Sequence, residues 1–450
     1  AGDLVSPAFF LSEAETVMRV SNIGRREVLA TGAAALAHPA AAKPRRTMPK
    51  DFLWGAAISA HQSEGGNTNS DAWLMENLKP SMFKERSGDA CDSYHRYGED
   101  FAIAAGLGFN CYRLGVEWAR IEPSEGFFSN AELDHYVRVL EACRARGLKP
   151  IVTLNHFTTP LWFAQRGGFE VSDAPALFAR FCRKVVERLG PLMHMATTFN
   201  EANIRLLVDL MPGFRTALPT VRTAVAAAAK ATNSPRFSRL AYADPAVVTP
   251  IMQEAHRQAY DAIKAVRPSL PVGLTLTTQD IQSDDPRLVE LYRHRLYGDW
   301  IAVAGSHADF FGVQTYTRFV FDQNGMRPPP PGAELTLSGY EFYPQALAET
   351  IRWAHAAIGK PIYVTENGIA THDDTRRIAF IDAALDGLWG CLEDGIPVHS
   401  YLYWSLLDNF EWTAGYGVPF GLTAVDRSTF KRTPRPSALH LGRIARSNAL

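Results

Sequence analysis

The sequence predicts one closed (β/α)8 barrel, a TIM barrel with long loops at the C-terminal ends of its strands. Eight short apolar or β-prone runs alternate with amphipathic stretches between residues 48 and 450, and this alternation is typical of βαβ units with a parallel sheet. No Gly/Ser-rich linker or repeat divides the region. Barrels of this kind span roughly 200 to more than 400 residues, so the remaining chain fits a single domain.

The predicted strands are short runs of apolar or β-branched residues bounded by polar or turn residues. In chain order they cover residues 52–59, 110–118, 150–157, 194–201, 270–278, 309–317, 361–368 and 398–408. Eight strands that alternate with helices favour closure into a barrel over an open sheet.

The predicted helices lie between these strands, at residues 131–146, 176–189, 251–266, 346–358 and 376–393. Two further segments are irregular in sequence. Residues 212–250 contain an Ala-rich helix at 221–231 followed by a Pro/Ser/Tyr-rich stretch, and residues 324–338 contain four consecutive prolines. Both follow strands at the C-terminal face, where long loops shape a substrate entrance.

Charge and cysteine content narrow the range of ligands. Lys and Arg number 46 against 47 for Asp and Glu, so the chain lacks the basic stripe expected of a nucleic-acid-binding protein. The five cysteines, Cys91, Cys111, Cys143, Cys182 and Cys391, are scattered and form no metal-binding pattern. We expect small core residues there, no metal or other cofactor, and a neutral small molecule as the ligand. Nothing in the pattern specifies an oligomeric state.

The first 47 residues differ in composition from the rest. Arg25-Arg26 precedes a mildly apolar run at 28–37, and the segment ends in Ala40-Ala41-Ala42. A charged region, a short apolar region and small residues describe an export signal, and the arginine pair resembles a twin-arginine signal. Met18 is then the natural start. We expect a periplasmic or secreted enzyme; a cytoplasmic protein with an Ala-rich tail is the alternative. The apolar run is too short to span a membrane.

Two of the predicted strands end in a glutamate. Glu201 closes the string TFNE at 198–201, and Glu366 lies in TENG at 365–368. Because the C-terminal ends of barrel strands line the active site, these two carboxylates are expected to converge from different strands. Paired carboxylates of this kind carry out glycoside hydrolysis.

The other strand ends supply amide, imidazole, carboxylate and aromatic side chains. They are Gln62, His156, Asn200, Tyr316, Trp404, Glu411 and Trp412. Sugar hydroxyls need polar partners that donate and accept, whereas the C–H faces of a sugar pack against aromatic rings. The set therefore predicts a carbohydrate pocket.

Seven strings together resemble glycoside hydrolase family 1, the β-glucosidase family. They are FLWGAAISAHQSEG (52–65), YR (112–113), VTLNHF (152–157), TFNE (198–201), DFFGVQTY (309–316), TENG (365–368) and WSLLDNFEW (404–412). The resemblance runs from about residue 49 to residue 438. It implies a retaining β-glycosidase without a cofactor, whose substrate is a small β-glycoside or an oligosaccharide with a terminal β-linked glucose.

The resemblance also implies roles for individual residues. Glu366 is the expected nucleophile and Glu201 the expected acid/base, while Tyr316 and Arg113 orient Glu366 and keep it ionised. Asn200 is expected to bind the sugar 2-hydroxyl, and Trp404 to form the stacking floor. The expected substrate-binding set is completed by Gln62, His156, Glu411, Trp412 and Phe420.

Elementary electrostatics supports Glu366 as the nucleophile and Glu201 as the acid/base. A nearby arginine lowers the pKa of Glu366, and the negative charge of Glu366 raises the pKa of Glu201. Once the sugar esterifies Glu366, that charge disappears and Glu201 becomes acidic enough to act as a base toward water.

Departures from the family pattern leave the sugar preference open. Gln314 stands where asparagine is usual, Thr315 replaces an aromatic residue, Phe157 replaces a tryptophan, and His61 replaces a common tyrosine. Galactose and fucose therefore remain alternatives to glucose.

Other functions compete with hydrolysis of a β-glycoside, and a thioglucosidase is disfavoured because it would lack the acid/base that Glu201 supplies. A 6-phospho-β-glycosidase is disfavoured because the Glu411 carboxylate would repel phosphate. A non-catalytic carbohydrate-binding protein would lack one of the two glutamates, and both are present. A transglycosidase would use the same residues and stays open.

Overall fold

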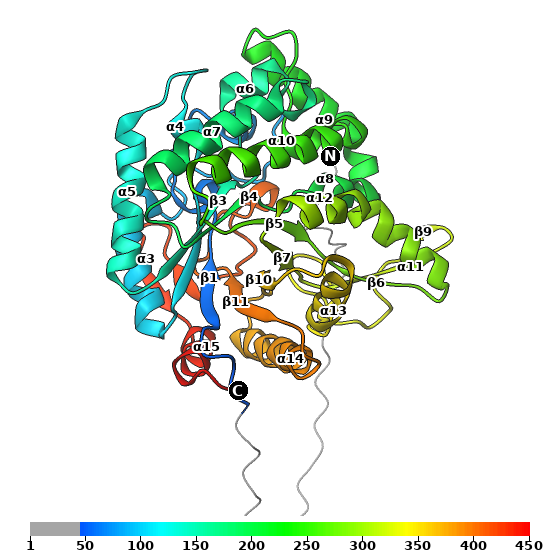
Figure 1. Ribbon diagram of the computed structural model, residues 1–450. Helices are drawn as coiled ribbons and strands as arrows, with labels where there is room; N and C mark the ends of the chain where they lie inside the picture. The colour runs from blue at the N-terminus through cyan, green and yellow to red at the C-terminus, as the bar shows by residue number, and fades with distance from the viewer. Residues whose placement is uncertain (1–45) are drawn as a thin grey trace, which may run out of the picture.

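The eight predicted strands close into one parallel barrel (Figure 1). The computed structural model describes residues 46–450; residues 1–45, nearly all of the predicted leader, lie outside them. The barrel strands are β1 (Leu53–Ala57), β2 (Cys111–Gly115), β3 (Lys149–Asn155), β4 (Met195–Phe199), β5 (Val272–Thr277), β7 (Phe310–Gln314), β10 (Ile362–Asn367) and β11 (Val398–Trp404). They follow one another around the barrel in chain order, and β11 pairs with β1 to close it.

Each predicted strand overlaps an observed one, but most predictions extend too far at the C-terminal end. Residues 398–408, for example, contain the strand Val398–Trp404, and residues 110–118 contain Cys111–Gly115. The residues that follow β11 remain buried because they turn over the mouth of the barrel. Hydropathy therefore does not mark the point at which the strand ends.

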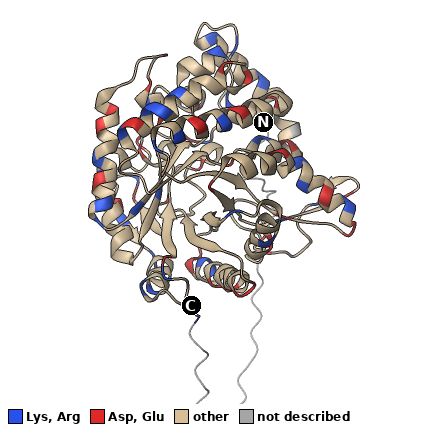
Figure 2. Ribbon diagram, in the orientation of Figure 1, with Lys and Arg blue, Asp and Glu red and all other residues tan. Residues whose placement is uncertain are grey.

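Helices surround the strands. They are α1 (Ala60–Ser63), α2 (Asp71–Asn77), α3 (Ser93–Leu107), α4 (Trp118–Ile121), α5 (Asn130–Ala145), α6 (Leu161–Arg166), α7 (Ala174–Leu189), α8 (Ile204–Leu210), α9 (Pro212–Ala231), α10 (Pro245–Val266), α11 (Pro286–Arg293), α12 (Asp299–His307), α13 (Ala346–Ile358), α14 (Asp374–Glu393) and α15 (Pro436–Ser447). Charged residues are concentrated on these helices, whereas the strands are largely uncharged (Figure 2). None of the described helices is long and apolar enough to cross a membrane.

Short elements complete the fold at its periphery. β6 (Asp280–Gln282), β8 (Arg318–Asp322) and β9 (Gly325–Met326) form a small sheet, and β12 (Thr423–Val425) pairs with β13 (Arg432–Pro434). Single turns of tighter or wider helix lie at η1 (Gly168–Glu170), η2 (Leu240–Tyr242), η3 (His294–Gly298) and η4 (Trp412–Ala414).

The segment 212–250 is more helical than its sequence predicts. α9 begins at Pro212 rather than at 221, and α10 begins at Pro245 rather than at 251. Both prolines occupy the first turn of their helix, where the missing N–H has no intrahelical partner to lose. Both helices therefore begin earlier than predicted, within the segment that was expected to be irregular.

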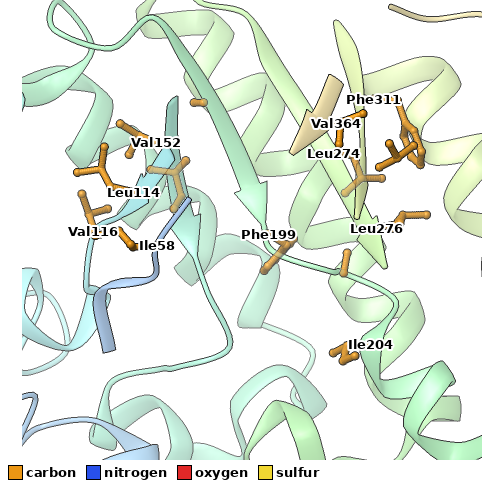
Figure 3. Close-up of a cluster of buried hydrophobic side chains, with 14 of the residues drawn as sticks. Ile58, Leu114, Val116, Val152, Phe199, Ile204, Leu274, Leu276, Phe311 and Val364 are labelled. Carbon is orange, nitrogen blue, oxygen red and sulfur yellow. The ribbon is translucent and has the colours of Figure 1, made fainter. Parts of the chain in front are cut away.

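Apolar packing fills the barrel at one end and leaves the other end to polar side chains. A small cluster of Leu53, Cys111, Ile151, Met195, Phe310 and Leu402 is separate from the large core, and most of its members lie near the start of a barrel strand. The large core includes Leu114, Val152, Leu274 and Val364 on the barrel strands (Figure 3). The strands are thus held by apolar contacts, while the C-terminal ends remain available for a site. All five cysteines are buried and free.

One glycine in the barrel wall tests this packing. A Cβ added at Gly55 would lie 2.4 Å from the Cys111 carbonyl oxygen and 2.8 Å from its Sγ, so β1 and β2 would have to separate. We expect Gly55→Ala to destabilise the fold by about 1–3 kcal/mol, the usual cost of overpacking, and to lower the midpoint of thermal unfolding.

Gly98→Ala is the matched control. Gly98 lies inside α3, and an added Cβ would meet no atom within 4 Å. Alanine favours the helix by about 1 kcal/mol relative to glycine, so this variant should unfold at an equal or higher temperature. An unchanged midpoint for Gly55→Ala would contradict the close strand approach.

Candidate active site

A pocket opens at the C-terminal end of the barrel. Ten of the eleven residues proposed from the sequence line it, namely Gln62, His156, Asn200, Glu201, Tyr316, Glu366, Trp404, Glu411, Trp412 and Phe420. The eleventh, Arg113, lies on β2 and is completely buried. It reaches the pocket through its contacts to Glu366 and Asn200. The structure thus brings the whole predicted set together.

Two donors fix the Glu366 carboxylate at the end of β10. Arg113 Nη1 donates to Oε1 at 2.5 Å, and the Tyr316 hydroxyl donates to Oε2 at 2.6 Å. Each carboxylate oxygen therefore has its own partner, one of them charged. Charge-assisted hydrogen bonds of this length are among the strongest in proteins, so the orientation of the carboxylate is set before any ligand arrives.

The same arginine positions Asn200. Arg113 Nη2 donates to Asn200 Oδ1 at 2.6 Å, and Gln314 Nε2 donates to the same oxygen at 2.8 Å. With its oxygen held in this way, Asn200 presents its amide nitrogen as the donor for a ligand. From the sequence, Gln314 was recognised only as a departure from the family pattern. Its place at the end of β7 was the signal that could have assigned it to the site.

Glu201 has a different environment. It follows β4 in a left-handed backbone conformation with φ of 42°, which few residues other than glycine adopt. Its backbone N–H donates to Thr275 Oγ1 at 3.3 Å, and the Thr277 side chain hydrogen-bonds its carboxyl group. Both threonines lie on β5, the one barrel strand for which no candidate residue was predicted, either on the strand or after it.

The two carboxyl groups differ in their affinity for a proton. Burial, followed by the negative charge of Glu366, raises the pKa of Glu201 well above its ordinary value. Burial also raises the pKa of Glu366, but Arg113 and Tyr316 oppose that shift. The net direction for Glu366 is therefore upward, not the lowering that the sequence analysis expected from Arg113 alone. Because only Glu366 is held by a cation, it carries the charge of the pair and Glu201 keeps the proton.

Gln62 and Glu411 form a second polar group in the pocket. Gln62 Oε1 accepts from the Ser59 hydroxyl at 2.7 Å, while Nε2 donates to the Phe410 carbonyl oxygen at 2.9 Å and to Glu411 Oε2 at 3.2 Å. Burial and then the charge of Glu366 raise the pKa of Glu411 to about 8. Both side chains are thus positioned with unused acceptor or donor capacity toward a ligand.

Aromatic rings form one wall. The His156 ring stacks on Trp404 at 5.6 Å between centroids and on Trp412 at 6.4 Å. Burial lowers the pKa of His156 well below its ordinary value, so the ring is neutral at physiological pH. His61 stacks on Trp412 at 5.5 Å with an interplanar angle of 5°. The departure of His61 from the family pattern thus supplies the support beneath Trp412.

The two irregular segments contribute unequally to the pocket. Phe214, Ala217, Arg239, Ala241 and Tyr242 come from residues 212–250 and line it, as predicted. The described lining contains no residue from 324–338. Leu337 instead packs beside Trp404 and Phe420, so that segment supports the pocket wall from outside.

Comparison with known proteins gives a consistent result. The sequence profile described as Glycosyl hydrolase family 1 matches residues 44–283 and 306–450. The apo structure of a β-glucosidase is 47% identical, with a TM-score of 0.86 over 88% of this chain and 98% of that one. A solved β-glycosidase is 46% identical, with a TM-score of 0.85 over 90% and 98%. The β-glucosidase A of Thermotoga maritima is 28% identical over 90% of this chain and 99% of its own.

The raised pKa of Glu411 has a consequence for stability. Between pH 4.5 and about 8 the unfolded chain has released a proton that the folded protein retains at Glu411. Stability must therefore fall as the pH rises through that interval. We expect Glu411→Gln to unfold at a higher temperature than the wild type near pH 8 and at a similar temperature near pH 4.5. The measurement is the thermal midpoint across this range.

The exposed Glu99 provides the control for this comparison. Glu99→Gln should change the midpoint little, and by a similar amount at both pH values. A Glu411→Gln variant that is less stable than the wild type near pH 8 would show that the carboxylate is stabilised, not penalised, in this pocket.

Proposed function

We propose that this chain, which belongs to glycosyl hydrolase family 1 and is therefore a glycoside hydrolase, removes terminal non-reducing β-D-glucosyl residues with retention of configuration. The proposal rests on the difference between the surroundings of the two carboxyl groups. Glu366 is held by Arg113 and Tyr316, whereas Glu201 is buried beside the charge of Glu366. A retaining glycosidase needs one carboxylate as the nucleophile and one carboxylic acid as the proton donor.

In the first step the Glu366 carboxylate attacks the anomeric carbon. The bond from that carbon to the glycosidic oxygen breaks, and the proton on Glu201 moves to the departing oxygen. The sugar is then esterified to Glu366 and the aglycone leaves as an alcohol. Arg113 and Tyr316 keep the attacking carboxylate oriented, which removes much of the entropic cost of reaching the reactive geometry.

In the second step Glu201 acts as a base. Esterification removes the negative charge of Glu366, which is the second largest cause of the raised pKa of Glu201. The Glu201 carboxylate takes a proton from water, and the resulting hydroxide attacks the anomeric carbon from the face that the aglycone left. The ester bond breaks and Glu366 regains its charge. Two inversions give net retention.

The sugar preference follows from the second polar group and the aromatic wall. Gln62 and Glu411 are paired and face the pocket, which suits two adjacent hydroxyls of one hexose. Trp404 and His156 supply the stacking surface. The relatives described as β-glucosidases support glucose as the natural sugar; β-galactosides and β-fucosides remain the alternatives. Relative kcat/KM values for a panel of aryl β-glycosides test this order.

We also propose that the enzyme works in the periplasm or outside the cell. Support comes from the arginine pair at 25–26 and the short apolar run at 28–37, the pattern of a twin-arginine export signal. Replacement of both arginines by lysine should retain the protein in the cytoplasm, as measured by cell fractionation. Unchanged export would contradict the proposal.

Removal of the nucleophile should abolish turnover. Glu366→Ala leaves no carboxylate to attack the anomeric carbon, so we expect kcat to fall by at least about 10⁴-fold, within the range that loss of a catalytic nucleophile costs. The circular dichroism spectrum should not change. Exposed Glu187→Ala is the matched control and should keep wild-type kcat/KM. Activity near the wild-type level in Glu366→Ala would refute the nucleophile assignment.

Removal of the acid/base should separate the two steps. Glu201→Ala should still form the ester with substrates whose leaving groups need no proton, and should then stall because no base activates water. Added azide, a nucleophile that needs no base, should restore turnover. Nuclear magnetic resonance should show a β-glycosyl azide as the product, since a second inversion has occurred. An α-configured product would overturn the retaining mechanism.

A further inference from the structure

The part of the pocket that the strand ends do not form is mostly apolar. It is lined by Met82, Ile204, Val208, Phe214, Ala217 and Ala241. Ile204 and Val208 lie on α8, and Phe214 and Ala217 lie on α9. Rings of Phe157 and Trp412 border the same space and pack on each other at 5.5 Å between centroids. A second sugar would find few hydroxyl partners here, whereas an aromatic group would bury its surface.

One arginine interrupts this apolar lining. Arg239, just before η2, has only 4% of its surface exposed and lies against the rings of Tyr242, Phe83 and Trp412 at 5.2, 5.5 and 5.7 Å. Arg239 is the only arginine or lysine among the described residues that line the pocket. All the other lining residues that can carry a full charge near neutral pH are acidic: Glu201, Glu366 and Glu411.

The polar atoms at this position are incompletely satisfied. The nearest carboxylate is that of Asp71, with 3.7 Å between Arg239 Nε and Asp71 Oδ2. At this distance the Asp71 carboxylate offsets the charge of Arg239, but the two atoms are too far apart to form a hydrogen bond. Arg239 Nε and the hydroxyl oxygen of Tyr242 are buried without a hydrogen bond to any other described residue, although the guanidinium and the hydroxyl lie close enough to interact with each other. Buried donors without acceptors are costly, and both residues border a pocket that a ligand can enter.

We propose that this subsite selects an aromatic aglycone that carries a carboxylate. The planar guanidinium of Arg239 matches a carboxylate in geometry, and the Tyr242 hydroxyl donates to the same group. The aromatic ring of the aglycone packs against the apolar lining and Trp412. This inference rests on the proposed function, because the aglycone is the group released in its first step.

Two glucosides of nearly equal size separate the effect of the aglycone's charge from the effect of its size. The probes are 4-carboxyphenyl β-D-glucoside and 4-carbamoylphenyl β-D-glucoside, which differ only in a carboxylate or a neutral amide on the ring. The measured quantity is the ratio of their kcat/KM values near neutral pH in each enzyme. Comparison of this ratio between enzymes cancels the intrinsic difference between the two leaving groups.

In Arg239→Gln the carboxylate-to-amide ratio should fall by about tenfold or more relative to the wild type, the loss expected for a hydrogen bond to a charged group. Arg239→Lys should recover part of the ratio. Arg236→Gln is the matched control, since Arg236 is exposed and lies in the same loop. It removes one positive charge without touching the pocket, so its ratio should equal that of the wild type.

Tyr242→Phe provides an independent test if Arg239→Gln does not fold, because it keeps both the ring and the arginine. Its ratio should fall by about threefold to fivefold, the loss expected for one hydrogen bond. A wild-type ratio in Arg239→Gln, or in Tyr242→Phe where Arg239→Gln does not fold, would overturn the inference and leave Arg239 as a structural partner of Asp71 and Trp412. Failure of the proposed function looks different: the wild type would then hydrolyse neither glucoside, nor any other aryl β-glycoside.

Discussion

The site depends on one buried cation. Arg113 is completely enclosed by the barrel, and its guanidinium donates hydrogen bonds to two acceptors, Glu366 Oε1 and Asn200 Oδ1. A buried charge is tolerated only when it is paired and hydrogen-bonded, so Arg113 keeps a negative charge on Glu366. Burial and then that charge raise the pKa of Glu201. The positions of the nucleophile and of the 2-hydroxyl partner therefore follow from a single side chain, which also contributes to the proton on the acid through Glu366.

The barrel supports this arrangement at a cost in stability. Glu201, Trp412 and Phe157 all line the pocket with positive φ angles of 42°, 48° and 71°, in a region that disfavours residues with a Cβ. Glu411 is buried with a pKa of about 8. The fold retains these unfavourable features because apolar contacts on both sides of the strands hold the backbone in place. The C-terminal ends of the strands thus hold the site residues, and the other ends hold apolar residues that stabilise the fold.

The barrel and the strand-end residues could be predicted from repeating patterns in the sequence. Contacts between segments far apart in the chain could not. Eight strands and the two glutamates followed from alternation and position, because both depend on local sequence. The lengths of α9 and α10 did not, since Pro212 and Pro245 favour a helix start as much as a loop. Gln314 and Arg239 act through neighbours far away in the chain. The net pKa shift of Glu366 required the balance of burial against Arg113, which only the folded structure provides.

Together with burial, the charge of Glu366 holds the proton on Glu201. The most direct measurement is the pKa of Glu201 by carboxyl-¹³C nuclear magnetic resonance, in the free enzyme and after Glu366 has been esterified by a 2-deoxy-2-fluoroglucosyl group. We expect a marked fall in the pKa of Glu201 on esterification, because the neighbouring charge disappears. A pKa of Glu201 that stays the same or rises would show that burial alone sets it, and would contradict the coupling on which the mechanism depends.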